Sequence, residues 1–77
     1  MANQKVDARR LLCPMPVIRL QEHVDKANPG DTISIEFTDP GGRHDIPAWC
    51  RINGHKLIED SELEDGFRIT VEVVAQA

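Results

Sequence analysis

The sequence predicts an α+β fold: a two-layer α/β sandwich with two helices on one face of a four-stranded mixed sheet, in the order βαβαββ. Two patterns predict this class. Residues 33–37 and 67–73 alternate apolar and polar side chains, as half-buried strands do, whereas residues 17–27 repeat apolar side chains at helical spacing. Because the strands alternate instead of being apolar throughout, we expect one face of the sheet to contact water.

Turn signals separate the elements in the first half of the chain. Lys5–Ala8 is expected to form a short first strand. A helix then starts at Pro14 and Pro16, because proline is tolerated in a first turn, where the amides lack intrahelical partners. We expect this helix to run to about Ala27, where an Asn-Pro-Gly-Asp turn ends it. Its apolar stripe has four members: Val17, Leu20, Val24 and Ala27.

The second half of the chain predicts a further helix and two more strands after the strand at 33–37. Since proline fits a first turn best, Pro47 places the start of the second helix at His44 or Asp45, and we expect it over about 45–52. Lys56–Glu59 forms a short strand, and an Asp-Gly turn at 65–66 precedes the last strand. The inner face of the second helix carries Ile46, Trp49 and Cys50.

Length and charge narrow the classes of function. The chain has 77 residues, so we expect a single domain over residues 1–77, too small to enclose a deep pocket. A net charge of −4 and a low aromatic content argue against direct nucleic-acid binding, which relies on Lys, Arg and stacking aromatics. No stretch approaches the roughly 20 apolar residues of a membrane span, and the N-terminus lacks the apolar core of a signal peptide. We therefore expect a cytoplasmic monomer without membrane contact.

Cys13 is the first candidate for chemistry. A residue just before a helix lies beside unpaired amides and the positive end of the helix dipole, and both favour a thiolate and lower the pKa of a cysteine. Pro14 and Pro16 stiffen this first turn. Three arginines close in sequence would add positive potential: Arg9, Arg10 and Arg19. The alternative is that Cys13 is a small buried apolar side chain, as most free cysteines are.

The residues around Cys13 are similar to a known motif. Residues 7–17 read Asp-Ala-Arg-Arg-Leu-Leu-Cys-Pro-Met-Pro-Val, and with this run the sequence resembles the TusA-type (SirA-like) family of sulfur carriers. Its Cys-Pro-x-Pro motif is specific in a domain of this size. One difference is Arg10, where the family usually has glycine. Later segments extend the likeness over nearly the whole chain: Thr38-Asp39-Pro40, Asp45-Ile46-Pro47, Trp49-Cys50, Gly54-His55 and Asp65-Gly66-Phe67.

The resemblance implies a sulfur carrier that accepts sulfane sulfur as a persulfide on Cys13. The donor would be a cysteine desulfurase or a rhodanese-like protein, and the acceptor would be a reactive cysteine of another protein. Known routes in the family are tRNA thiolation, molybdenum-cofactor supply and sulfur oxidation. Such a protein acts stoichiometrically with its partners and is a sulfurtransferase-type relay more than a self-contained enzyme. No organic cofactor is implied, and no Cys-x-x-Cys or paired-His spacing predicts a metal site.

Met15 and Ile18 fall away from the apolar stripe of the first helix, so we expect them to be exposed near Cys13. An apolar surface beside a reactive thiol suggests that partner proteins dock there, with Arg19 as a further contact. The alternative interpretation is that they are scattered exposed apolar residues, which are normal on protein surfaces.

Cys50 is the second thiol, and its place on an inner helix face predicts a buried core cysteine. Two other functions stay open. A non-catalytic binding or regulatory module would leave Cys13 inert, so Cys13→Ala would keep all activity. A thiol-redox protein would form a reversible disulfide between Cys13 and Cys50, and Cys50→Ser would abolish its function.

Overall fold

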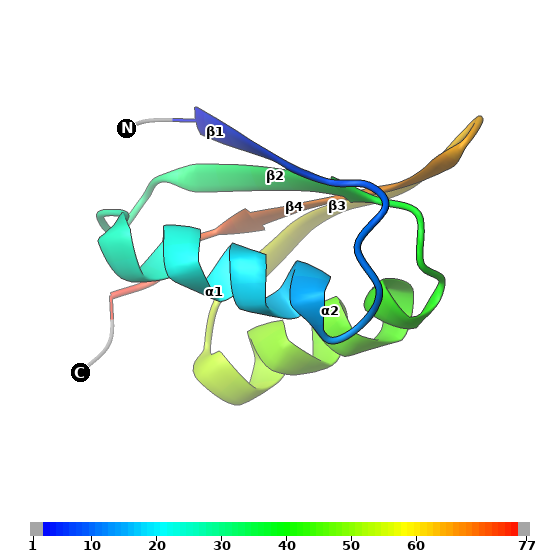
Figure 1. Ribbon diagram of the computed structural model, residues 1–77. Coiled ribbons are helices and arrows are strands. Elements are labelled where there is room, and N and C mark those ends of the chain that lie inside the picture. Colours follow the sequence, from blue (N-terminus) through cyan, green and yellow to red (C-terminus); the bar gives the residue numbers. More distant parts are fainter. Residues whose placement is uncertain (1–2, 76–77) are drawn as a thin grey trace.

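The computed structural model describes residues 3–75, which form four strands and two helices in the order βαβαββ (Figure 1). The elements are β1 (Asn3–Ala8), α1 (Met15–Lys26), β2 (Thr32–Phe37), α2 (Gly41–Asn53), β3 (Lys56–Leu63) and β4 (Gly66–Glu72). The strand order is β1-β2-β4-β3, with β1 and β2 parallel and the other two pairs antiparallel. Both helices cover the same face of the sheet, so the predicted two-layer sandwich with a mixed sheet is confirmed (Figure 1).

The hydrophobic core lies between the two layers. From β2, Ile33, Ile35 and Phe37 point toward the helices and are completely buried. Leu20 of α1 and Ile46 of α2, also completely buried, meet them from the other layer. Burial of each such side chain stabilises the folded state by about 1.5–3 kcal/mol. These buried side chains come from the periodic apolar positions of the sequence.

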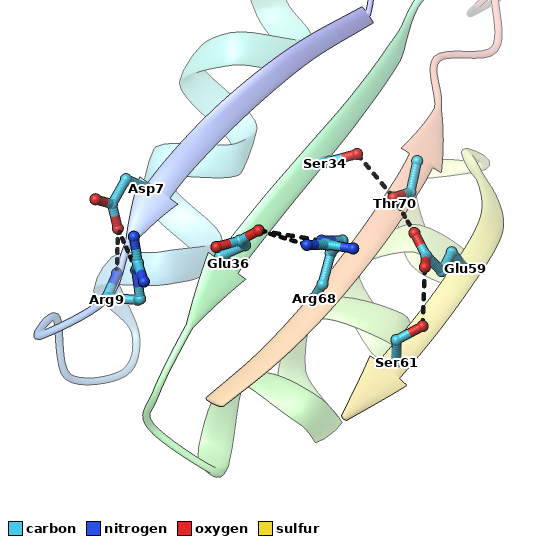
Figure 2. A network of polar contacts seen from close by, with 8 residues as sticks. All are labelled: Asp7, Arg9, Ser34, Glu36, Glu59, Ser61, Arg68 and Thr70. Atoms are coloured by element: carbon cyan, nitrogen blue, oxygen red, sulfur yellow. Dashed lines mark hydrogen bonds and ion pairs between the residues drawn. The ribbon is translucent and has the colours of Figure 1, made fainter. Parts of the chain in front are cut away.

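The other face of the sheet carries partly buried polar side chains (Figure 2). Ser34 and Thr70 lie opposite each other on β2 and β4 with their hydroxyl oxygens 2.8 Å apart, and Thr70 donates to Glu59 of β3 at 2.9 Å. Arg68 donates twice to the Glu36 side chain opposite it, at 2.9 and 3.1 Å. The expectation that one sheet face contacts water is therefore confirmed, and these cross-strand pairs favour the observed register.

Two boundaries differ from the prediction by three residues or more. α2 begins at Gly41, about one turn earlier than expected, and Pro47 lies inside it. The expectation was wrong because it weighed only the local restriction of Pro47. The Asp39 side chain accepts the Gly41 N–H at 3.0 Å, which satisfies an amide that a helix start leaves without a partner. β3 also runs to Leu63, beyond the expected end at Glu59, because its pairing with β4 continues to the turn.

The parallel pairing of β1 and β2 determines where the loops meet. Ala8 and Phe37 are the last residues of these strands, and they lie opposite each other in the register. Because parallel strands end at the same edge of a sheet, the loop at 9–14 and the loop at 38–40 leave the sheet side by side. Figure 1 shows both connections, in blue and green, at one end of the molecule. The first residues of α1 and α2 consequently lie at that end.

Candidate functional site

Cys13 lies in the loop between β1 and α1, two residues before the helix begins. The Met15 N–H donates to the Leu12 carbonyl at 2.9 Å, which closes the turn that contains Cys13. The Arg10 N–H donates to Thr38 Oγ1 at 3.3 Å, which ties this loop to the loop after β2. The position of the thiol is therefore fixed relative to the start of α2.

Asp39 joins the two loops more directly. Its Oδ2 accepts the Cys13 N–H at 2.7 Å, and its Oδ1 accepts the Gly41 N–H at 3.0 Å. These two backbone hydrogen bonds hold the pKa of Asp39 below its usual value. Asp39 is thus a charged structural link, with one carboxylate oxygen bonded to the loop before α1 and the other to the first residue of α2.

Gly41 leaves the space that the sulfur occupies. A Cβ atom at this position would lie 3.1 Å from Cys13 Sγ, which is closer than an ordinary contact. The sulfur of the half-buried Cys13 side chain therefore sits against the bare backbone of the first turn of α2. Glycine is favoured here by the close approach of the sulfur and not by an unusual backbone angle.

The electrostatic environment of Cys13 is negative. Burial, a hydrogen bond to the Asp45 side chain and the charges of Asp39 and Asp45 together raise the pKa of this thiol to about 11. The expectation that the helix start lowers this pKa is therefore wrong, because it left out two carboxylates from α2 and the loop before it. At neutral pH, roughly one thiol in ten thousand is ionised at such a pKa. The resting thiol is protonated.

Two of the three arginines near Cys13 in sequence pair with other carboxylates. Arg9 pairs with Asp7 at 3.2 Å and Arg19 pairs with Glu22 at 3.4 Å, both at exposed positions. Arg10 has a backbone φ of +76°, in the left-handed region that favours glycine. Glycine, which the resemblance leads us to expect at this position, adopts such an angle without steric cost. The predicted support of the Cys13 anion by arginine is not seen in this structure.

The two prolines of the motif differ in burial. Pro14 is exposed and immediately precedes the first helical residue, whereas Pro16 is completely buried under the first turn of α1. Neither position needs an N–H donor, as expected for a helix start. The peptide bond between Cys13 and Pro14 is cis.

Exposed apolar side chains flank Cys13. The predicted exposure of Met15 and Ile18 is confirmed, at 36% and 43% of their surface. Leu12, which the sequence analysis did not single out, is 74% exposed and directly precedes Cys13. These three residues, Leu12, Met15 and Ile18, are called the apolar patch below. Arg19 is half exposed and follows Ile18.

Cys50 is 2% exposed and belongs to the core, so the prediction of a buried cysteine is confirmed. Burial raises the pKa of its thiol to about 11. Cys13 and Cys50 are both free thiols in this structure. Within residues 3–75, no three His, Cys, Asp or Glu side chains converge as metal ligands, and neither helix has the length and apolar character of a membrane span.

Comparison with known proteins gives consistent matches. The family model described as Sulfurtransferase TusA matches residues 4–73. The sulfur carrier protein TusA of Pseudomonas aeruginosa (strain LESB58) is 42% identical over 57 residues, which cover 74% of this chain and 72% of that protein. The sulfur carrier protein TusA of Pseudomonas putida (strain GB-1) is 40% identical over 57 residues, covering 74% and 71%.

A solved structure agrees with the fold. The crystal structure of the SirA-like protein from Desulfitobacterium hafniense matches with a TM-score of 0.82 at 19% identity. The match covers 94% of this chain and 99% of that chain. The whole arrangement of helices and sheet is therefore shared with that protein.

Proposed function

The chain belongs to the TusA family of sulfurtransferases, and we propose that it is a sulfur carrier that holds sulfane sulfur as a persulfide on Cys13. The observation that carries this proposal is the placement of Cys13. Its thiol is free and half-buried in a loop that Asp39 fixes, beside an exposed apolar patch. A thiol at the surface suits exchange with the cysteine of another protein better than turnover of an enclosed small substrate.

The exchange reaction needs no added oxidant or reductant. The Cys13 sulfur attacks the terminal sulfur of a persulfide on the donor, and the sulfur–sulfur bond of the donor breaks. The donor cysteine departs as a thiol that carries the proton from Cys13, and Cys13 becomes a persulfide. A second exchange of the same kind passes the sulfane sulfur to a cysteine of the acceptor.

The proposal extends to the partners. The donor is a cysteine desulfurase or a rhodanese-like protein, and the acceptor is a protein with a reactive cysteine in tRNA thiolation or another sulfur-transfer route, including sulfur oxidation. The apolar patch is the docking surface, with Arg19 beside it, because desolvation of apolar side chains would stabilise a transient complex around the thiol. The protein acts as a cytoplasmic monomer without metal or organic cofactor in this proposal.

The test is the intact mass of the protein after incubation with a cysteine desulfurase and cysteine, with and without later dithiothreitol. We expect a gain of about 32 mass units, one sulfur, that reductant reverses. Cys13→Ser abolishes the gain, whereas Cys50→Ser, the matched control, retains it because that thiol is buried.

Two outcomes would contradict the proposal. If neither the desulfurase nor thiosulfate, polysulfide or a rhodanese adds sulfur, the non-catalytic binding module gains support. If Cys50→Ser prevents loading and the wild-type protein forms a reversible disulfide, the thiol-redox function gains support.

A further inference from the structure

Helix α2 carries Asp45 on the same face as Gly41, the residue that lies against the sulfur of Cys13. Gly41 and Asp45 are four residues apart in α2 and therefore lie on the same helix face. Side chains in a helix lean toward its N-terminus, so the Asp45 carboxylate reaches back over Gly41, whose bare backbone contacts the sulfur. The Asp45 carboxylate is among the groups that raise the pKa of the Cys13 thiol, which agrees with this placement.

The two carboxylates near the thiol differ in what they can do. Asp39 bonds the backbone of Cys13 through one oxygen and that of Gly41 through the other, so it cannot change partners without separating the loops. Asp45 lies on an exposed part of α2, where another protein can reach its carboxylate. Asp45 is therefore the carboxylate whose effect on the thiol can change during a docking event.

The neighbouring cation of α2 is engaged away from Asp45. Arg43 pairs with Asp60 at 3.6 Å and with Glu62 at 3.2 Å, and its guanidinium lies 5.2 Å from the centre of the Phe67 ring. His44 is exposed on the same helix. The negative surface next to the sulfur is thus complementary to a cation that a docking protein brings.

We propose that Asp45 is a gate on Cys13: it holds the proton on the thiol in the free carrier, and a Lys or Arg side chain of the donor protein opens the gate by pairing with it. The inference rests on the proposed function of Cys13 as a sulfur carrier. Pairing withdraws both the hydrogen-bond acceptor and the negative charge from the sulfur, and each of them disfavours the thiolate. The proton then leaves with the donor cysteine, so the exchange stays balanced. Asp45 acts in this scheme as a positioning residue for recognition and timing.

Asp45→Asn tests the gate, because it removes the charge and keeps the size of the side chain. Three rates are measured by mass spectrometry at pH 7.5: alkylation of Cys13 by iodoacetamide, loading by inorganic polysulfide, and loading by a cysteine desulfurase with cysteine. We expect the first two rates to rise about tenfold, since each unit by which the thiol pKa falls multiplies the thiolate fraction by about ten. We expect the desulfurase rate to fall about tenfold, because the donor cation loses its partner.

The opposite changes expected for the small-reagent rates and the desulfurase rate distinguish a gate from simpler roles of Asp45. Acceleration of all three rates would overturn the proposal, because Asp45 would then suppress the thiolate without recognising a donor. Deceleration of all three would overturn it as well, since Asp45 would be structural. Asp45→Glu, which keeps the charge, should restore desulfurase loading, and Asp25→Asn, an exposed acid of α1, should change none of the rates. Failure of the wild-type protein to load from any source would count against the proposed function itself.

Discussion

Arg10 has a backbone φ of +76°, a conformation that a residue with a Cβ adopts only at a steric cost. The left-handed conformation costs about 1–2 kcal/mol in such a residue and has no comparable cost in glycine. Replacing Arg10 by glycine would remove this cost, but the greater conformational freedom of glycine in the unfolded chain offsets about 0.5–1 kcal/mol of the stabilisation. We therefore expect Arg10→Gly to raise the free energy of unfolding by about 0.7 kcal/mol. The backbone hydrogen bond to Thr38 needs no side chain at this position and is retained.

Thermal unfolding followed by circular dichroism measures this effect. For a chain of this length, about 0.7 kcal/mol corresponds to a rise of about 3–5 °C in Tm. Gly54 provides the reciprocal control, because it ends α2 with the same φ of 76°, and Gly54→Ala should lower Tm by a similar amount. Arg9→Gly, at a neighbouring position without a left-handed angle, should lower it slightly. A Tm at or below the wild-type value for Arg10→Gly, with Gly54→Ala behaving as expected, would refute the argument from backbone strain.

Four further predictions concern the site and the core. Gly41→Ala should slow persulfide loading in the mass assay, because the new Cβ would lie 3.1 Å from Cys13 Sγ and displace the thiol. Asp39→Ala removes the acceptor of two backbone N–H groups and should lower the free energy of unfolding in urea by about 2 kcal/mol. Met15→Glu should slow loading by a cysteine desulfurase at least several-fold and leave loading by small sulfane donors nearly unchanged, because it places a charge on the apolar patch. The pKa of the Cys50 thiol is raised to about 11 from 9.0, so the folded protein keeps a proton that the unfolded chain loses, and the contribution of Cys50 to the free energy of unfolding should fall by about 2 kcal/mol as pH rises from 9 to 11.

Each of these predictions has an outcome that contradicts it. Unchanged loading of Gly41→Ala would mean that the sulfur has room to move. An Asp39→Ala protein as stable as Asp25→Ala would show that the link between the loops contributes little. Equal loss of loading from protein and small donors in Met15→Glu would exclude a docking role, and Ile52→Glu, at an exposed apolar position of α2, is its control. A flat stability profile between pH 9 and 11, or a slope that Cys50→Ala does not reduce, would contradict the linkage argument, whereas the remaining slope belongs to groups such as Cys13.

The regular parts of the fold follow from local patterns. The alternation in residues 33–37 and 67–73 predicts β2 and β4, since both strands bury one face against the helices. The start of α2 was missed because the expectation used only the local restriction of Pro47, whereas the first N–H of the helix, that of Gly41, donates to the Asp39 side chain outside the helix. Helical spacing alone was sufficient to predict that Met15 and Ile18 are exposed.

The protonation state of Cys13 could not be predicted from its neighbours in sequence. Asp39 and Asp45 approach the thiol only because β1 and β2 pair in parallel and their following loops meet. A sequence signal was present, since the Asp39-Pro40-Gly41 turn follows a strand that the βαβ order places beside the first strand. The expectation rested on the helix dipole of α1 and on three nearby arginines, and it left out the opposing carboxylates.

The different burial of the two cysteines also makes the protein a reporter of its own local unfolding. A small alkylating reagent reaches Cys13 in the folded state, whereas it reaches Cys50 only when α2 separates from the sheet. The labelling rate of Cys50, divided by the rate in an unstructured peptide of the same sequence, gives the population of that opened state. Labelling of Cys13 in the same sample shows that the reagent is active throughout. The opening free energy of α2 is therefore measurable in the natural sequence, without an introduced probe.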